Sequence, residues 1–156
     1  MKGKIIAGAM GNCVHVAGVV RFLTLAEELG YETRFLGAAV SVDEFIREIK
    51  EFDPDIIGLS FRLTPEVAGK LIEDFKAKMG EDALKKYRFV FGGTPPVCRV
   101  AEKAGIFERC FTGLENTSDI MEFLGCSSGN CTVRRYSDNL LERIESSQPA
   151  PILRHH

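Results

Sequence analysis

Hydrophobic positions recur along this chain with two different periods, and the two periods alternate. A short apolar run at residues 4–9 is followed by a polar, glycine-containing stretch, and then by apolar residues spaced three and four apart. The first pattern predicts a buried strand, and the second predicts a helix with one buried face. The same succession of strand and helix recurs as far as residue 124.

This alternation predicts five strands, within residues 4–9, 31–36, 55–61, 87–91 and 106–111. Helices are predicted over residues 16–29, 41–52, 64–80, 97–104 and 116–124. Local signals support several helix ends. Ser41 precedes Glu44 by three positions, as in a capping box, and Pro65 occupies the first turn of its helix.

Strands that alternate with helices, each joined by a right-handed crossover, favour one architecture. We predict an α/β fold with a flavodoxin-like, doubly wound, five-stranded parallel sheet, Rossmann-like in its general form. Such sheets bind ligands in a crevice at the carboxyl ends of the strands. Residues 1–125 would form this domain. Residues 126–156, with an amphipathic pattern at 133–146, would form a linker or arm that leads to, or docks on, a catalytic domain.

Charge and composition narrow the functional classes. The chain has 156 residues, a formal net charge of −2, 45% hydrophobic and 27% charged residues, which is ordinary for a globular protein. No basic surface for nucleic acid is implied. No apolar run reaches the roughly 20 residues that cross a bilayer, and the amino terminus lacks the form of a signal peptide. We therefore predict a cytoplasmic protein with neither a nucleic-acid nor a membrane partner.

Five cysteines are present, an odd number without a secretion signal, and this predicts reduced thiols rather than a disulfide framework. Cys126 and Cys131 form a C-x4-C pair in a stretch rich in Ser and Gly. A zinc site would need two more ligands, and the only nearby candidates are His155 and His156. We therefore favour a flexible linker over a zinc site.

Candidate chemistry lies in three segments that follow predicted strands, at residues 11–18, 60–64 and 92–94. The first contains Cys13 and His15. Imidazole is the commonest metal-ligating side chain near neutral pH, although a single loop histidine more often caps a helix. Because the carboxyl ends of parallel strands meet at one edge of the sheet, we expect the three segments to converge.

The residues of these segments resemble a known signature. The chain reads C-x-H-x-x-G at residues 13–18, Ser60-Phe61-Arg62-Leu63, and Gly92-Gly93. Over residues 3–124 it resembles the cobalamin-binding domain of corrinoid mutases, methionine synthase and corrinoid methyltransferases, whose motifs are D-x-H-x-x-G, S-x-L and G-G at similar spacing.

The resemblance implies cobalamin bound in the base-off/His-on form. His15 would be the lower cobalt ligand in place of the cofactor's own dimethylbenzimidazole, and Ser60 would hydrogen-bond the displaced base. Gly18, Gly92 and Gly93 would give the nucleotide tail room, and Gly113 would lie over its far end. The predicted cofactor-binding residues are Asn12, Cys13, Val14, His15, Val16, Ala17, Gly18, Ser60, Arg62, Leu63, Thr64, Gly92, Gly93, Thr94 and Gly113.

Two positions depart from the family pattern. Cys13 stands where the family has an aspartate that holds the second nitrogen of the histidine. Because a neutral thiol is a weak hydrogen-bond partner, we expect His15 to be a less basic ligand. Arg62 stands where an apolar residue is usual, and its guanidinium could contact the amides or the phosphate of the cofactor, or a partner protein.

The function predicted is that of the cofactor-binding component of an adenosylcobalamin-dependent mutase, resembling the small subunit of glutamate mutase. The first strand begins near residue 4, which leaves no room for the helical cap that usually precedes this domain in methyltransferase corrinoid proteins. The alternatives are such a corrinoid protein, loaded with methylcobalamin, or a non-catalytic cobalamin carrier or sensor. The domain would not be catalytic alone, and its expected partner is a catalytic barrel domain or subunit, with a homodimer as a further candidate assembly.

Overall fold

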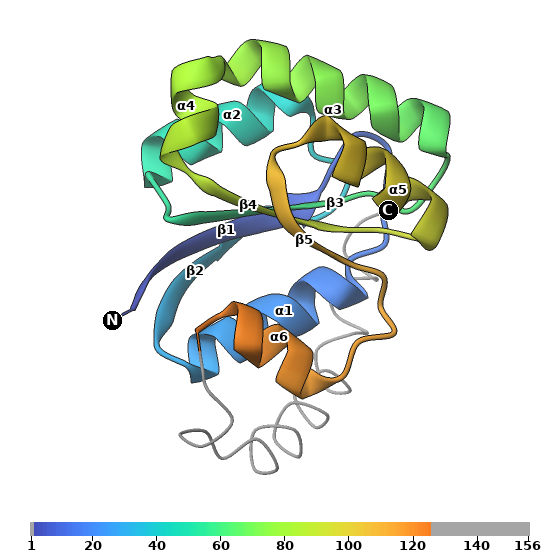
Figure 1. The fold of residues 1–156 in the computed structure, drawn as a ribbon. Coiled ribbons are helices and arrows are strands. Elements are labelled where there is room, and N and C mark those ends of the chain that lie inside the picture. Colours follow the sequence, from blue (N-terminus) through green and yellow to red (C-terminus); the bar gives the residue numbers. More distant parts are fainter. Residues whose placement is uncertain (1, 126–156) are drawn as a thin grey trace.

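A computed structural model describes residues 2–125. In it, the predicted strands form an open parallel sheet, and the predicted helices connect them (Figure 1). The strands run in the order β2-β1-β3-β4-β5, and every neighbouring pair is parallel. This order confirms the predicted flavodoxin-like, doubly wound sheet. The five strands are β1 (Gly3–Ala9), β2 (Tyr31–Phe35), β3 (Ile56–Ser60), β4 (Arg88–Gly92) and β5 (Phe107–Phe111).

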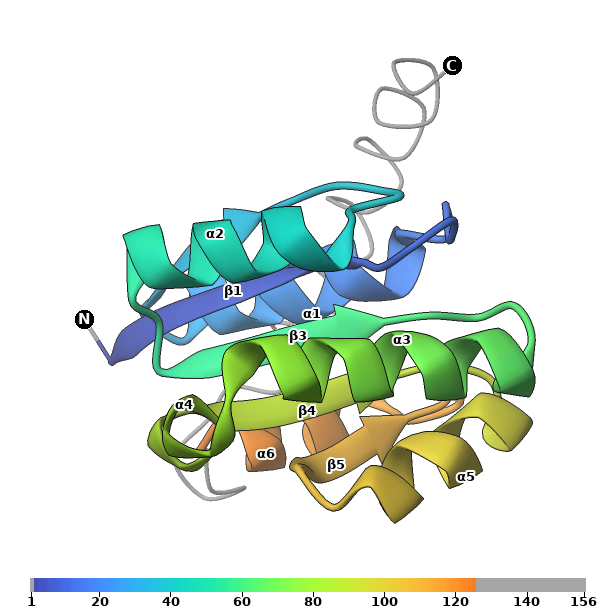
Figure 2. The ribbon, with the colours of Figure 1, turned by 90° about the horizontal axis from the view of Figure 1, so that it is seen from above.

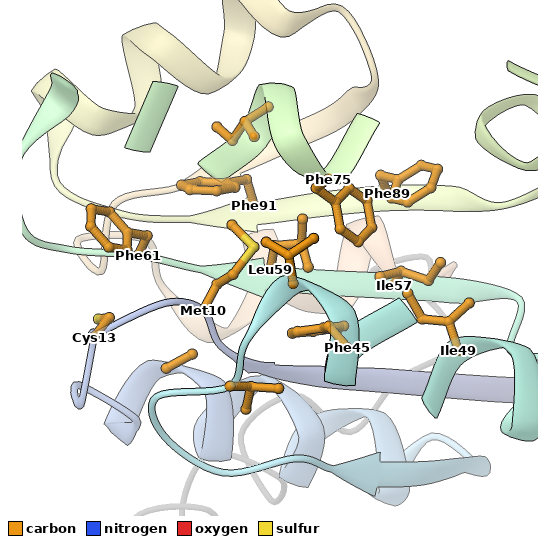
Figure 3. Packing of buried hydrophobic residues seen from close by; sticks show 14 of the residues in the cluster. Met10, Cys13, Phe45, Ile49, Ile57, Leu59, Phe61, Phe75, Phe89 and Phe91 are labelled. Atoms are coloured by element: carbon orange, nitrogen blue, oxygen red, sulfur yellow. The ribbon is translucent and has the colours of Figure 1, made fainter. Parts of the chain in front are cut away.

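Helices cover both faces of the sheet (Figures 1 and 2). One face carries α2 (Val42–Phe52), α3 (Pro65–Met79) and α5 (Pro95–Ala104), and the other carries α1 (Ala17–Glu28) and α6 (Thr117–Phe123). Side chains of a strand alternate between these two layers. Ile6 and Ile57 therefore pack under α2 and α3, whereas Ile5 and Ile56 pack against α1. Figure 3 shows the hydrophobic core between the sheet and helices α2, α3 and α5.

The helix ends follow the local signals in the sequence. The Ser41 hydroxyl accepts a hydrogen bond from the Glu44 amide at 3.1 Å, and the Thr64 hydroxyl accepts one from the Val67 amide at 3.3 Å. A short helix, α4 (Glu81–Lys86), was not predicted. None of its residues is buried, so it has no apolar stripe that a periodicity argument could detect.

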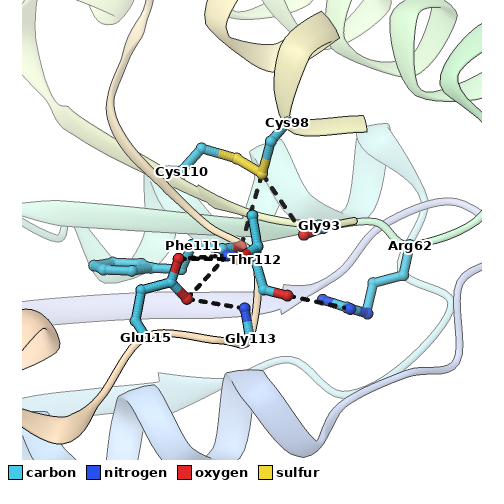
Figure 4. The surroundings of a disulfide bond; sticks show 8 residues. All are labelled: Arg62, Gly93, Cys98, Cys110, Phe111, Thr112, Gly113 and Glu115. Carbon is cyan, nitrogen blue, oxygen red and sulfur yellow. Dashed lines mark hydrogen bonds between the residues drawn. A yellow bond between two sulfur atoms is a disulfide. The ribbon is translucent and has the colours of Figure 1, made fainter. Parts of the chain in front are cut away.

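A disulfide joins Cys98 on α5 to Cys110 on β5, with the two Cα atoms 5.8 Å apart (Figure 4). The prediction of reduced thiols is therefore wrong for these two cysteines. The number of cysteines carries no information about distance, and the packing of α5 against β5 brings this pair together. Within residues 2–125, Cys13 is the free cysteine, and it is buried.

No helix between residues 2 and 125 combines the length and the apolar character needed to span a membrane. The predicted arm at residues 126–156, with its helical pattern at 133–146 and its Cys126–Cys131 pair, lies outside the described residues.

Candidate functional site

The loop between β1 and α1 buries the side chain of Cys13 and exposes that of His15 to solvent. Its backbone is fixed by hydrogen bonds from the Gly11 amide to Val40 O, at 2.8 Å, and from the Ala39 amide to Cys13 O, at 2.8 Å. Cys13 is fully buried and belongs to the core cluster shown in Figure 3. His15 is exposed.

The Sγ atom of Cys13 lies 3.7 Å from Nδ1 of His15. This contact occupies the position at which a ligating histidine usually meets a hydrogen-bonding partner that fixes its ring. Within residues 2–125, Nε2 of His15 has no hydrogen-bond partner. The exposed imidazole can therefore use Nε2 as a metal ligand, with a thiol as its weak support.

A cavity of about 640 Å³ lies beside this loop, between α1 and the carboxyl half of the sheet. Its walls come from the first half of α1, from the ends of β1, β3 and β4, and from the segment between β5 and α6. This volume lies within the usual range for small-molecule sites. The lining is mainly apolar, so the cavity suits a flat apolar group that carries a few polar atoms.

Small residues on one face of the sheet form the floor of this cavity. Ala7 pairs with Gly58 across β1 and β3, and Ser60 pairs with Gly92 across β3 and β4. All four line the cavity. Since they occupy alternate positions of neighbouring strands, their short side chains share a face and leave the space between sheet and helix unfilled.

Ser60 places a hydroxyl group on this apolar floor. Ser60 is 8% exposed, and its hydroxyl has no hydrogen-bond partner within residues 2–125. No buried side-chain oxygen or nitrogen of these residues lacks a partner, so this hydroxyl keeps accessible surface, and Ser60 lines the cavity. A ligand with a ring nitrogen or another polar atom in the cavity would supply the missing bond.

The two glycines of the Gly92-Gly93 motif differ in their surroundings. A Cβ atom on Gly92 would have its nearest neighbours at 3.8 Å and 3.9 Å, namely Phe111 O and Ser60 Oγ, so it would fit there in ordinary van der Waals contact. A Cβ atom on Gly93 would lie 2.7 Å from Phe61 O. Gly93 is buried and does not line the cavity, so close packing of the backbone explains why this position holds glycine.

The far wall is the turn after β5, which Glu115 organises (Figure 4). Its carboxylate accepts hydrogen bonds from the amides of Thr112 and Gly113 and from the Thr112 hydroxyl, at 2.9–3.1 Å. Partial burial opposes ionisation, but backbone N–H groups of Thr112, Glu115 and Gly113 outweigh it and hold the pKa of Glu115 below its ordinary value. Arg62 donates to Thr112 O at 3.3 Å, which links the β3–α3 loop to this turn.

The structure brings together most of the predicted site residues. Those that line the cavity are Val14, His15, Val16, Ala17, Gly18, Ser60, Arg62, Gly92 and Gly113. The others lie near the same edge of the sheet but not in the cavity wall. Cys13 and Gly93 are buried, Asn12 and Leu63 are exposed, and Thr64 and Thr94 are the N-cap residues of α3 and α5. A cofactor-binding role for each of these residues remains a prediction.

Sequence reasoning missed a second group of cavity residues. These are Ala7, Val19, Val20, Arg21, Phe22, Gly58, Leu59, Val90, Phe91, Phe111, Glu115 and Ile120. For Gly58 a signal was present, because small residues at positions 58 and 60 alternate with bulky ones in an otherwise apolar strand. For Arg21 and Glu115 no local signal exists, since only the packing of α1 beside the β5–α6 segment brings them to the cavity.

These residues fit the cofactor that the motifs suggest. An exposed imidazole at the rim offers a metal ligand, and the small-residue floor leaves room for a nucleotide tail. The unpaired hydroxyl of Ser60 meets the need of a buried base for a hydrogen-bond partner.

Comparisons with known proteins agree with this reading. Dimethylamine corrinoid protein 3 of Methanosarcina mazei is 31% identical over 118 residues, which are 75% of this chain and 67% of that protein. A cobalamin-binding protein of Desulfitobacterium hafniense DCB-2 matches in structure with a TM-score of 0.63 and 26% identity, covering 79% of this chain and 59% of that one. The monomethylamine corrinoid protein of Methanosarcina barkeri matches with a TM-score of 0.61, covering 79% of this chain and 57% of that one; at 19% identity it supports the fold alone.

The chain spans about half to two thirds of the length of the curated relatives it matches. Residues 3–121 match the family described as the B12 binding domain. This match covers the same region as the predicted resemblance and confirms it, together with cobalamin or a related corrinoid as the cofactor. The strand order, the cavity beneath His15 and the extent of this match lead to one conclusion: the chain belongs to the B12-binding domain family.

Proposed function

We propose that this chain is the corrinoid-carrying component of a methyltransferase system. The cavity beside His15, with the unpaired Ser60 hydroxyl on its floor, carries the corrinoid-binding part of this proposal. Relatives with up to 31% identity are named dimethylamine corrinoid proteins, which favours methyl transfer from a methylated amine or a similar small donor.

The mutase function predicted from the sequence is less well supported than this alternative. That prediction relied on the short stretch before the first strand. The chain spans only about half to two thirds of its curated relatives, so the position of the first strand does not discriminate between the two systems. A catalytic methyltransferase subunit is therefore the partner we propose.

The chain's own residues would bind and orient the cofactor. His15 would ligate cobalt through Nε2 while the Cys13 thiol contacts Nδ1, and Ser60 would donate to or accept from the displaced base. Gly18 and Gly92 would leave space for the tail. A bound corrinoid supplies a cobalt centre that carries a methyl group from a donor to an acceptor.

Cobalt ligation by His15 is tested by loading the full chain with hydroxocobalamin and reducing it to the cobalt(II) state. The electron paramagnetic resonance spectrum should show splitting by one axial nitrogen, and this splitting should change when histidine carries ¹⁵N. His15→Ala should abolish the change. Replacing the other two histidines, His155 and His156, by alanine is the matched control and should preserve it. Splitting that is insensitive to histidine labelling would refute ligation.

The methyltransferase assignment is tested by the upper ligand of the cofactor. The chain is purified from its source without oxygen and in the dark, and the extracted corrinoid is identified by mass spectrometry. We expect a methyl group on cobalt. A 5′-deoxyadenosyl group would refute the proposal and restore the mutase reading.

A further inference from the structure

Two arginines line the mainly apolar cavity, Arg21 from α1 and Arg62 from the β3–α3 loop. Within residues 2–125 neither of them forms an ion pair, and their hydrogen-bond acceptors are all neutral. Arg62 donates to Thr112 O at 3.3 Å, and Arg21 donates to Glu115 O at 3.2 Å and to Thr117 Oγ1 at 3.5 Å. Each guanidinium carries five N–H donors, so most of these donors remain available.

The carboxylate of Glu115, which also lines the cavity, forms no ion pair with Arg21 or Arg62. Glu115 directs its oxygens to the amides of Thr112 and Gly113 and to the Thr112 hydroxyl (Figure 4). The cavity therefore contains two cations whose charge is not balanced at ion-pair distance by any described residue. A positive charge that is partly removed from water in this way favours an anionic ligand group.

The first turn of α1 adds backbone N–H groups, which also favour an anionic ligand group. Its N-cap residue, Val16, makes no side-chain cap, and the turn contains no acidic residue. The N–H groups of Ala17, Gly18 and Val19 have no intrahelical acceptor, and all three residues line the cavity. The hydroxyl of Ser60, a residue that is only 8% exposed, lines the same cavity and has no hydrogen-bond partner within residues 2–125, which is an independent sign that a ligand group completes this site.

We propose that Arg62, together with Arg21, binds the phosphodiester of the corrinoid's nucleotide tail, so that the site selects corrinoids that carry a complete tail. The inference rests on the proposed cofactor-binding function and assigns a specificity-determining role within it. A phosphodiester is anionic throughout the physiological pH range, and a guanidinium can contact two of its oxygens at once. Arg62 would exchange its long bond to a neutral carbonyl for charge-assisted bonds.

The test compares two probes that differ in the tail. Hydroxocobalamin has the nucleotide with its phosphodiester, and aquocobinamide lacks both. Each is titrated into the wild type, Arg62→Gln, and the matched control Arg99→Gln, with binding followed by the corrinoid absorption bands. Arg99 is exposed on α5 and lies outside the cavity.

We expect Arg62→Gln to weaken hydroxocobalamin binding by about tenfold to a hundredfold, the usual effect of losing a charged hydrogen bond. Aquocobinamide binding should not change, and the control should bind both probes as the wild type does. Added KCl should weaken hydroxocobalamin binding by the wild type more than by Arg62→Gln. Arg62→Lys, which keeps the charge, should restore part of the affinity.

Three results would overturn the inference. An equal loss for both probes would place Arg62 against the corrin ring, and unchanged binding of both would remove any contact. If Arg62→Gln unfolds, the ³¹P resonance of hydroxocobalamin bound to the wild type decides, and a resonance unshifted from that of the free cofactor would overturn the inference. Failure of the wild type to bind either probe is a separate outcome, because it would refute the proposed function itself.

Discussion

Replacing each glycine of the Gly92-Gly93 pair by alanine should have opposite consequences. The Cβ atom of Gly93→Ala would lie 2.7 Å from Phe61 O and 3.0 Å from side-chain atoms of Phe91 and Val97. Phe61 O is a backbone atom of a fully buried residue, so it cannot move aside as a flexible side chain could. This substitution should therefore strain the packing of β3 against β4.

The size of the effect follows from the kind of contact. Overpacking a well-filled interior typically costs about 1–3 kcal/mol, and the rigid obstacle at Gly93 places it in the upper half of that range. A loss of about 2 kcal/mol lowers the melting temperature of a chain of this length by roughly 5–8 °C. At Gly92 the added Cβ meets nothing closer than 3.8 Å. Gly92→Ala should therefore fold with unchanged stability, or gain about 0.5 kcal/mol because its unfolded state is less flexible.

Binding should rank the two variants in the reverse order. The methyl group of Gly92→Ala enters the cavity 3.9 Å from Ser60 Oγ, where the nucleotide base is proposed to lie. We expect hydroxocobalamin affinity to fall by about tenfold, and further for Gly92→Val. Urea unfolding monitored by circular dichroism gives the stability, and absorption titration of the folded variants gives the affinity. A Gly93→Ala variant as stable as the wild type, or a Gly92→Ala variant less stable than Gly93→Ala, would refute this reasoning.

Three further predictions follow from other contacts. Cys13→Asp would give Nδ1 of His15 a carboxylate partner in place of a thiol, and hydroxocobalamin should bind about tenfold more tightly; unchanged affinity would contradict the role given to Cys13. The pKa of Glu115 is lowered in the fold, so its carboxylate adds stability above the ordinary value of 4.5, and this contribution disappears as the pH falls through the lower folded pKa. Urea midpoints should therefore separate the wild type from Glu115→Gln near neutral pH and converge in acid, and a gap that persists in acid would refute this. Reduction of the Cys98–Cys110 disulfide, which closes a loop of sequence separation 12, should cost about 3 kcal/mol; full alkylation of both cysteines without prior reduction would show that the bond is absent.

Local sequence information was sufficient for the order and type of most elements. The apolar run at Ile56–Ser60 and the capping residues Ser41 and Thr64 each express a preference that acts within a few residues. The alternation of strands and helices indicated a doubly wound sheet, and the flavodoxin-like order of such sheets is β2-β1-β3-β4-β5, so the observed order could be predicted. Helix α4 was missed because it buries nothing and leaves no periodic signal.

The sequence by itself determined the family and the residues that carry its motifs, among them His15, Ser60 and Gly92. Motif residues can be recognised along the chain because their types and spacing are themselves the signal. Only the tertiary structure decided which of these residues line the same cavity. It separated Gly92, which opens the cavity, from Gly93, which only permits close packing. It also joined Cys98 to Cys110 and brought Arg21 and Arg62 to one cavity. The physical reason is that a distance between residues far apart in the chain depends on how helices pack on the sheet, and no local preference encodes that distance.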